Sequence, residues 1–157
     1  MLIIRPITQE DQSILQQATF YNLNWKENRF TIEEIESNSQ LSHYYSGWKS
    51  SDFGFVCQKD QQILGIVWLK YFTENNPGFG FWDEETPELV LCIFPEYRNC
   101  GYGTRLLQMA IDEAKKRGIP SISLSVEFEN EVARNLYQKF GFRYLEGTDG
   151  SMLLDFL

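Results

Sequence analysis

Residues 98–103, Arg-Asn-Cys-Gly-Tyr-Gly, combine a cation with closely spaced glycines between two apolar patterns. The apolar run Leu89 to Phe94 precedes them and stops at Pro95, which cannot donate to a sheet ladder. From Thr104 onward, apolar residues recur at helical spacing. A strand, a glycine-containing turn and a helix leave backbone N–H groups unpaired at the positive end of the helix dipole. We therefore predict an anion site here, most naturally a phosphate site.

Two other phosphate-binding loops do not match this segment. A P-loop requires Gly-x-x-x-x-Gly-Lys-Ser/Thr, and the sequence has no such run. A dinucleotide-binding turn requires Gly-x-Gly-x-x-Gly, but after Gly101 and Gly103 the next required position holds Leu106.

The segment Arg98-Asn-Cys-Gly-Tyr-Gly103 resembles the acyl-CoA pyrophosphate loop of the GNAT superfamily of N-acetyltransferases, Arg/Gln-x-x-Gly-x-Gly/Ala. Downstream, the run from Asn130 to Phe142 resembles the second signature of that family, Asn-x-x-Ala-x-x-Leu-Tyr-x-x-x-Gly-Phe, at every named position. The two motifs occur in the family's order and at about its usual spacing. The resemblance covers the whole chain, although only residues 88–142 carry strong motifs.

The resemblance implies that acetyl-CoA is the acyl-donor substrate, with no metal, and that the acceptor amine attacks its thioester directly. Backbone N–H groups of Leu91, Cys92 and Ile93 are expected to pair with the pantetheine amides, and Asn130 to hold the pantetheine arm. The pyrophosphate is expected to lie against the Arg98 side chain and the N–H groups of Asn99, Cys100, Gly101, Tyr102, Gly103 and Thr104.

The leaving thiolate needs a proton or a hydrogen bond, and the family uses the tyrosine that corresponds to Tyr137. A phenol with a pKa near 10 is a slightly weaker acid than a thiol near 8.5, so full proton transfer is uphill by roughly 2 kcal/mol. A proton shared in the transition state would still assist departure. The alternative is that Tyr137 is one more ring on an apolar helix face.

The acceptor must also lose a proton, since an aliphatic ammonium with a pKa near 10.4 costs about 4.6 kcal/mol to deprotonate at pH 7. Glu88, at the start of the strand before the loop, is the candidate base by position. Strand alternation puts it on the face of Val90 and Cys92 unless a bulge reverses the register. It could instead be a strand-end surface charge, and Ser125 and Glu127 are weaker alternatives.

The composition predicts one globular domain spanning residues 1–157. The chain has 157 residues with 43% hydrophobic and 15% aromatic content, enough to bury a core. Its formal charge of −8, from 14 basic and 22 acidic residues, disfavours nucleic-acid binding and weakly favours a cationic acceptor. No stretch approaches 18 apolar residues, so we predict no membrane partner.

The cysteines Cys57, Cys92 and Cys100 show neither a disulfide framework nor Cys-x-x-Cys metal spacing. The N-terminal apolar run is too short for a signal peptide, and together these features predict a cytoplasmic protein. His43 is the only histidine, which argues against Ser-His-Asp and Cys-His catalysis.

The N-terminal third predicts a strand at residues 1–5 and two capped helices. Thr8 with Asp11 opens a helix to about Tyr21, and Thr31 with Glu34 opens one through about Asn38. Large rings crowd this region. Most are expected to pack on a sheet, whereas Trp25 and Tyr45 are candidates for the wall of an acceptor pocket.

The rest of the chain predicts strands and helices around the loop motif. Residues 53–59 and 62–72 form a hairpin, with Gly65 marking a bulge or a close backbone approach. Residues 73–87, acidic and aromatic, form an acceptor lid, a dimer contact or a solvated loop with its rings tucked down. A strand at 121–127, a helix capped by Asn130, and a hairpin of 142–145 with 151–157 complete the chain.

We therefore predict an α+β fold with a mixed, largely antiparallel sheet of six or seven strands and about four helices. The resemblance adds that the central parallel pair splays apart to admit CoA. The function expected is N-acetyl transfer to a small amine, a peptide N-terminus or a lysine. A non-catalytic acyl-CoA-binding sensor and another kind of nucleotide-binding protein remain alternatives, and the rings also allow a homodimer.

Overall fold

The computed structural model describes residues 1–156. The strands in this range are β1 (Leu2–Pro6), β2 (Phe53–Lys59), β3 (Gln62–Lys70), β4 (Glu88–Ile93), β5 (Ser121–Ser125), β6 (Arg143–Tyr144) and β7 (Ser151–Asp155). The α-helices are α1 (Gln12–Leu23), α2 (Ile32–Ser37), α3 (Ser39–Ser42), α4 (Tyr102–Lys116) and α5 (Glu131–Lys139). Short 3-10 turns span Gln9–Asp11 and Pro95–Tyr97.

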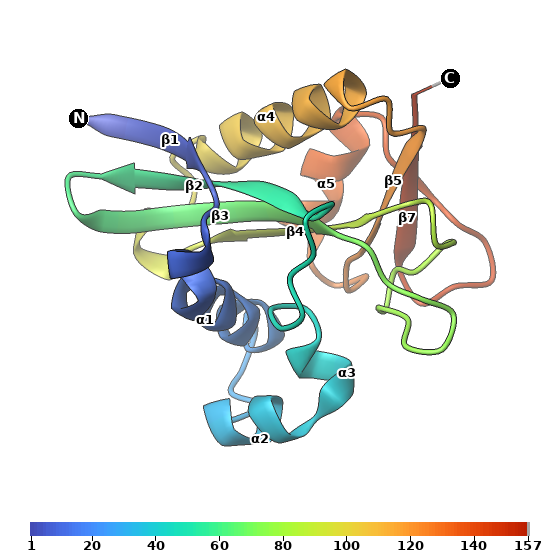
Figure 1. Ribbon diagram of the computed structural model, residues 1–157, viewed down its shortest axis with the longest axis horizontal. Coiled ribbons are helices and arrows are strands. Elements are labelled where there is room, and N and C mark those ends of the chain that lie inside the picture. The colour runs from blue at the N-terminus through green and yellow to red at the C-terminus, as the bar shows by residue number, and fades with distance from the viewer. Residues whose placement is uncertain (157) are drawn as a thin grey trace.

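All seven strands form one sheet in the order β1-β2-β3-β4-β5-β7-β6 (Figure 1). Every pairing is antiparallel except that of β4 with β5, which is parallel and registers only Glu88 against Ser123. Beyond this pair the two strands separate. The predicted α+β fold and its splayed parallel pair are confirmed.

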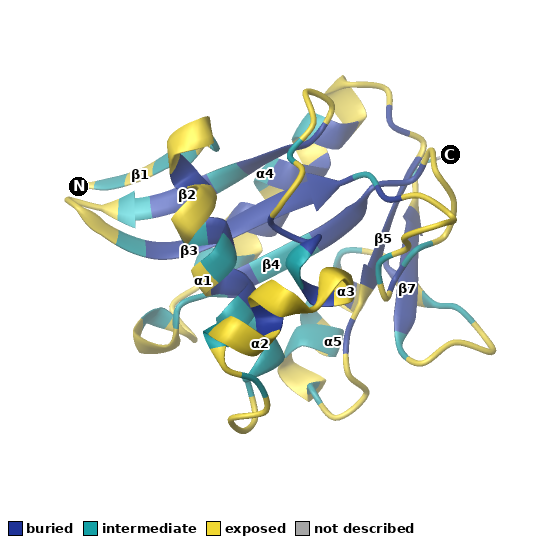
Figure 2. Ribbon diagram, turned by 60° about the horizontal axis from the view of Figure 1, so that its bottom comes forward, coloured by how far each residue is buried: buried dark blue, intermediate teal, exposed yellow. Residues whose placement is uncertain are grey.

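Helices α1, α2 and α3 cover one face of the sheet, and α4 and α5 cover the other (Figure 1). Helix α4 buries Leu106, Leu107 and Ala110 against the sheet, each 0% exposed, because the apolar residues of this helix recur every three or four positions. The α1 face buries Leu15 and Ala18. Figure 2 shows buried residues concentrated in the central strands, between the exposed outer sides of the helices.

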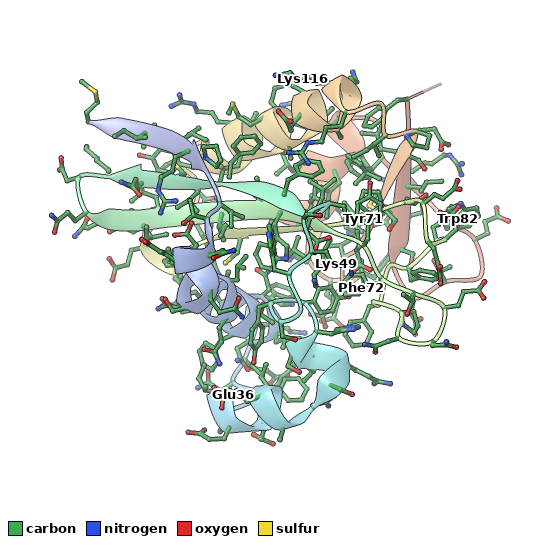
Figure 3. All side chains as sticks on the ribbon, viewed as in Figure 1. Glu36, Lys49, Tyr71, Phe72, Trp82 and Lys116 are labelled. Atoms are coloured by element: carbon green, nitrogen blue, oxygen red, sulfur yellow. The ribbon has the colours of Figure 1, made fainter. Side chains whose placement is uncertain are left out.

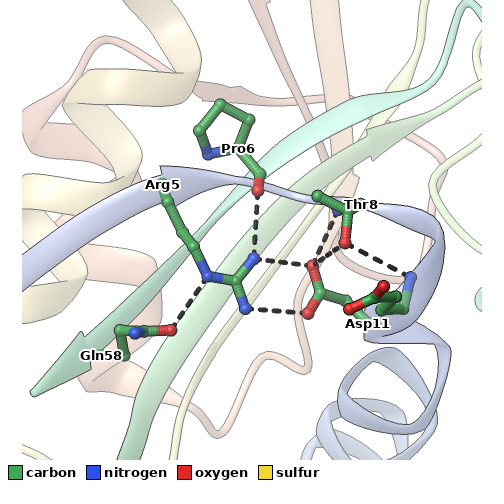
Figure 4. Close-up of polar contacts among 6 residues, drawn as sticks. Arg5, Pro6, Thr8, Asp11 and Gln58 are labelled. Atoms are coloured by element: carbon green, nitrogen blue, oxygen red, sulfur yellow. Dashed lines mark hydrogen bonds and ion pairs between the residues drawn. The ribbon is translucent and has the colours of Figure 1, made fainter. Parts of the chain in front are cut away.

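A polar cluster at the end of β1 turns the chain into its first helix (Figure 4). The Thr8 hydroxyl accepts the Glu10 N–H at 3.3 Å, and the Asp11 carboxylate accepts the Thr8 N–H at 2.8 Å, completing the predicted capping box. The Arg5 guanidinium donates to both Asp11 oxygens, at 2.8 and 2.9 Å, and its hydrogen bond lowers the pKa of that carboxyl. The cap opens a single 3-10 turn, after which α1 runs two residues beyond the predicted Tyr21.

Other boundaries differ from the sequence expectation by a few residues. Strand β3 ends at Lys70 and β5 at Ser125, while α4 already begins at Tyr102. The short helix α3 was not expected, since four residues carry too little periodicity to be recognised. The predicted final strand reached Leu157, which lies outside the described residues. No helix in residues 1–156 combines the length and hydropathy needed to cross a membrane.

Both expectations for Gly65 are met in the β2–β3 hairpin. The register shifts between Cys57 and Gln58, opposite Gly65, as a bulge requires. A Cβ atom at Gly65 would also lie 2.7 Å from Ile93 Cδ1, so α4 and β4 pack closely against this backbone.

Candidate active site between β4 and β5

The gap left by β4 and β5 opens into a cavity of about 500 Å³. Its walls come from both strands, from α1 with the segment after it, from α5, and from the loop that precedes β4. The cavity brings together several residues that the sequence singled out: Trp25, Glu88, Leu91, Ser125, Glu127, Asn130 and Tyr137.

Glu88 lies at the closed end of the splayed gap and is only 2% exposed, so the surface-charge alternative is wrong. Its register follows strand alternation without a bulge in β4, on the same face as Val90 and Cys92. Burial raises the pKa of the Glu88 carboxyl to about 7, although hydrogen bonds from Tyr44 and Gly80 oppose this rise. A carboxylate with that pKa is well suited to exchange protons near neutral pH.

Tyr137 lines the cavity from α5 and is 7% exposed. Its ring also packs edge-on against Phe142, with centroids 5.7 Å apart, so it belongs to the apolar helix face and to the cavity wall at once. Burial raises the pKa of the Tyr137 phenol above its ordinary value, with a further contribution from nearby Cys92. The phenol is therefore protonated at physiological pH and available as a donor.

The edge of β4 that faces the gap carries backbone N–H groups that point away from β3. The Phe94 N–H donates to Leu64 at 2.9 Å, toward β3, and strand alternation then turns the N–H groups of Leu91 and Ile93 away from β3 toward the gap. The Cys92 N–H faces β3 by the same alternation, which favours its two neighbours as donors to a ligand. Asn22 of α1, which sequence patterns did not single out, donates its side-chain amide to the Leu91 carbonyl at 3.1 Å.

The predicted anion site is built from left-handed backbone. Asn99 has φ 63° and Gly101 has φ 85°, a combination that turns the chain sharply into α4. Gly101 is the N-cap and no side chain caps this helix, so its first N–H groups remain available, as an anionic ligand requires. Arg98 and Cys100 are exposed beside this turn. The geometry fits a pyrophosphate group.

Asn130 is the N-cap residue of α5, and its Oδ1 accepts the Ala133 N–H at 3.3 Å. Because capping occupies the oxygen, the side-chain amide is the group left for a ligand in the cavity.

Of the two residues predicted to form the wall of an acceptor pocket, only one lines the cavity. Trp25 lines the cavity, but Tyr45 is 6% exposed and packs in the core under α1, so its assignment to the pocket is wrong. The adjacent Tyr44 lines the cavity instead and contacts Glu88. The sequence alone does not distinguish Tyr44 from the other rings of this region, because its partner Glu88 lies 44 positions away and no local spacing relates the two.

The 73–87 loop exposes two of its aromatic rings but brings part of its backbone into the site. Phe79 is 58% exposed and Trp82 51% exposed, and Figure 3 shows Trp82 at the outer margin of the molecule, whereas Phe72 lies inside. The loop backbone, in contrast, reaches the site, since the Gly80 N–H donates to Glu88. Of the three alternatives for this loop, the solvated loop with its rings tucked down is therefore wrong, whereas the acceptor lid and the dimer contact remain predictions.

Glu127 lies just beyond β5 and is exposed, unlike Glu88. Its carboxylate accepts a hydrogen bond from Trp25 and pairs with Arg29 at 2.7 Å. Lys26 forms a neighbouring ion pair with Glu129. These contacts join the segment after α1 to the β5–α5 loop at the exposed end of the cavity.

A protein-family sequence model, described as the acetyltransferase (GNAT) family, matches residues 18–142 of the chain. The chain belongs to this family. It is 40% identical over 122 residues to N-alpha-acetyltransferase 30 of Schizosaccharomyces pombe, covering 73% of this chain and 78% of that protein. It is 37% identical over 121 residues to the ribosomal protein bS18-alanine N-acetyltransferase of Haemophilus influenzae, covering 73% and 75%. The chain is accordingly an acyl-CoA-dependent acetyltransferase, which decides against an unrelated nucleotide-binding protein.

Other GNAT proteins agree in fold. The PaiA N-acetyltransferase of Thermoplasma acidophilum, solved in complex with coenzyme A, superposes with a TM-score of 0.68 at 24% identity over 99% of both chains. A GNAT acetyltransferase of Staphylococcus aureus gives a TM-score of 0.73 at 15% identity over 100% of both chains. In sequence, the chain is also 26% identical over 151 residues to a mycothiol acetyltransferase of Acidothermus cellulolyticus, and this match covers 92% of this chain but 44% of that protein.

Proposed function

We propose that residues 1–157 form one domain that transfers the acetyl group of acetyl-CoA to the α-amino group of a peptide or protein. One observation carries the proposal: Glu88 and Tyr137, a base and an acid, line the same cavity in the gap between β4 and β5. Two relatives above 30% identity support the acceptor class, since one is named an N-alpha-acetyltransferase and the other an alanine N-acetyltransferase.

The pKa of Glu88 also favours an α-amine. A carboxyl with a pKa of about 7 lies roughly one unit below an α-ammonium of 7.7–8.0, so proton transfer between them costs about 1.4 kcal/mol. Transfer from a lysine ammonium near 10.4 would cost about 4.6 kcal/mol. Glu88 is therefore better matched to a peptide N-terminus than to a lysine side chain.

The proposed reaction forms a C–N bond and breaks a C–S bond at the thioester carbonyl carbon. The acceptor nitrogen loses two protons overall. Glu88 takes the first before attack, and Tyr137 supplies the proton, or a strong hydrogen bond, that the departing sulfur needs. The second proton from nitrogen restores Tyr137, and the products are an N-acetyl amide and the free thiol.

Acetyl-CoA supplies the activated acyl group when bound. The N–H groups of Leu91 and Ile93 would hold its pantetheine arm with Asn130, and the Leu91–Ile93 edge would polarise the thioester carbonyl. The N–H groups of residues 99–104 with Arg98 would hold the pyrophosphate. All three cysteines are free thiols, which suits our placement of the protein in the reducing cytoplasm.

The test is a thiol-release assay with acetyl-CoA and a panel of peptides bearing free or blocked N-termini, each with and without a lysine. We expect release with free N-termini only. Tyr137→Phe should lower kcat about 100-fold and leave the Kd for acetyl-CoA within about two-fold. The matched control is Tyr144→Phe. Tyr144 does not line this cavity, and its hydroxyl is buried with no hydrogen-bond partner among the described residues.

Equal turnover of blocked peptides that contain lysine would overturn the α-amine assignment. A Tyr137→Phe enzyme with unchanged kcat would remove Tyr137 from the mechanism.

A further inference from the structure

The hydroxyl of Tyr44 joins Glu88 to the preceding loop. It lies 2.6 Å from Glu88 Oε2 and 2.7 Å from the Phe79 nitrogen. The Phe79 N–H can only donate, so the phenol oxygen accepts from it and directs its single hydrogen to the carboxylate. This orientation favours an ionised Glu88, which can only accept.

The second carboxylate oxygen is held by the same loop. Glu88 Oε1 accepts the Gly80 N–H at 3.1 Å. A Cβ atom at Gly78 would lie 2.3 Å from that oxygen, and one at Gly80 would lie 2.4 Å from the Leu124 carbonyl carbon. The missing side chain at Gly78 lets the loop backbone approach the carboxylate, and the missing side chain at Gly80 lets the same loop approach the backbone of β5.

Tyr44 itself is rigidly placed. It is 8% exposed, and its ring packs against those of Phe72 and His43, each with centroids 5.0 Å away, and stacks on Phe79 at 6.1 Å. The Trp68 indole donates to the Tyr44 carbonyl at 3.0 Å. The side chain therefore has little freedom to leave the carboxylate.

We propose that Tyr44 is a positioning residue that orients Glu88 toward the cavity and couples it to the 73–87 loop. This inference rests on the role of Glu88 as the general base. The other titratable groups near this pair are His43 beside the Tyr44 ring, Lys70 opposite Glu88 on β3, Cys92 on the same face of β4, and Tyr137, Arg29, Glu127 and Asp149 in the cavity wall. None of these groups forms a hydrogen bond to the Glu88 carboxylate among the described residues, so Tyr44 is its closest polar partner.

The experiment compares Tyr44→Phe with Tyr45→Phe, a buried neighbour that does not line the cavity. Loss of the Tyr44 hydroxyl removes the shorter of the two bonds to the carboxylate. The acidic limb of kcat/KM against pH should then move up by about one pH unit, because the lost hydrogen bond stabilised the ionised form of the carboxylate. Tyr45→Phe should leave the limb in place, and both should bind acetyl-CoA as the unaltered chain does.

A second readout follows Glu88 without turnover. In protein labelled with carboxyl-13C glutamate, the Glu88 resonance, assigned with Glu88→Gln, should titrate about one unit higher in Tyr44→Phe. An unshifted titration would overturn the role of Tyr44. A shifted titration with an unshifted rate profile would uphold the coupling and overturn Glu88 as the base.

Should Tyr44→Phe not fold, Tyr44 can be replaced site-specifically with 3-fluorotyrosine. This keeps the hydroxyl but makes it a stronger hydrogen-bond donor. The limb and the resonance should then move in the opposite direction, to lower pH, and an unchanged titration would contradict the proposal.

Discussion

Lys70 lies directly opposite Glu88 in the register of β3 and β4, yet its ammonium contacts Asp52 at 3.1 Å and the Gly47 carbonyl at 2.9 Å. Glu88 therefore takes its hydrogen bonds from neutral donors, Tyr44 and Gly80. Burial then outweighs these two bonds, and the pKa of Glu88 rises instead of falling as it would beside a cation.

The raised pKa of Glu88 has a consequence for stability. The native state keeps this proton up to about pH 7, whereas the unfolded carboxyl loses it near 4.5, so the stabilisation is complete below pH 4.5 and is lost as the pH rises through 7. We expect the unfolding free energy of the unaltered chain, relative to Glu88→Gln, to fall by about 2–3 kcal/mol between pH 5 and pH 8. Urea denaturation of both proteins measures this. A difference that stays constant with pH would contradict the raised pKa, and the subtraction cancels the contribution of His43.

Removing the partner of Lys70 should be costly. Lys70 and Asp52 are 2% and 5% exposed, so Asp52→Asn leaves a buried cation without its counter-ion. We expect a loss of about 3–5 kcal/mol in unfolding free energy by urea denaturation. The control is Glu113→Gln, which breaks the more exposed pair with Arg117 and should cost less than about 1 kcal/mol. Similar losses of unfolding free energy in the two variants would show that the buried Lys70–Asp52 pair stabilises the fold no more than an exposed pair does.

The close approach of the loop to β5 can be tested at Gly80. A Cβ atom there would lie 2.4 Å from the Leu124 carbonyl carbon, and backbone atoms cannot rotate away as a side chain can. Gly80→Ala should lower the unfolding free energy by about 1–3 kcal/mol. Gly103→Ala is the control for stability, since its Cβ would meet the nearest atom at 3.6 Å and alanine favours a helix. Equal stability of the two variants would contradict this loop geometry.

Glu127 should restrain the segment after α1. It pairs with Arg29 and accepts a hydrogen bond from Trp25, and trypsin can cut that segment after Lys26 or Arg29. We expect Glu127→Gln to speed these cleavages about five-fold, since a solvent-exposed ion pair restrains a segment only weakly. High salt should accelerate cleavage of the unaltered chain in the same way. Glu113→Gln serves as the control, and cleavage independent of both salt and Glu127 would show that these contacts do not hold the segment.

Local sequence determined most of the helices and strands of this protein and the residues of its proposed acetyl-CoA site. The capping boxes at Thr8 and Thr31, the helical apolar spacing of α4 and the glycine turn before it each depend on residues within a few positions of one another. Such interactions are short-range, so they can be read along the chain. The same is true of the proposed pyrophosphate loop, because its expected hydrogen-bond donors are consecutive backbone N–H groups.

Only the tertiary structure decided which side chains surround Glu88 in the proposed acceptor pocket. Glu88 was recognisable as a candidate base, but whether its carboxylate was exposed or buried depended on the loop and the helices that cover it. Tyr44 reaches it from 44 positions away, while Tyr45, one residue further, points into the core. Burial, and with it the pKa of a carboxyl, depends on every element packed around the group, and no spacing in the sequence encodes that sum.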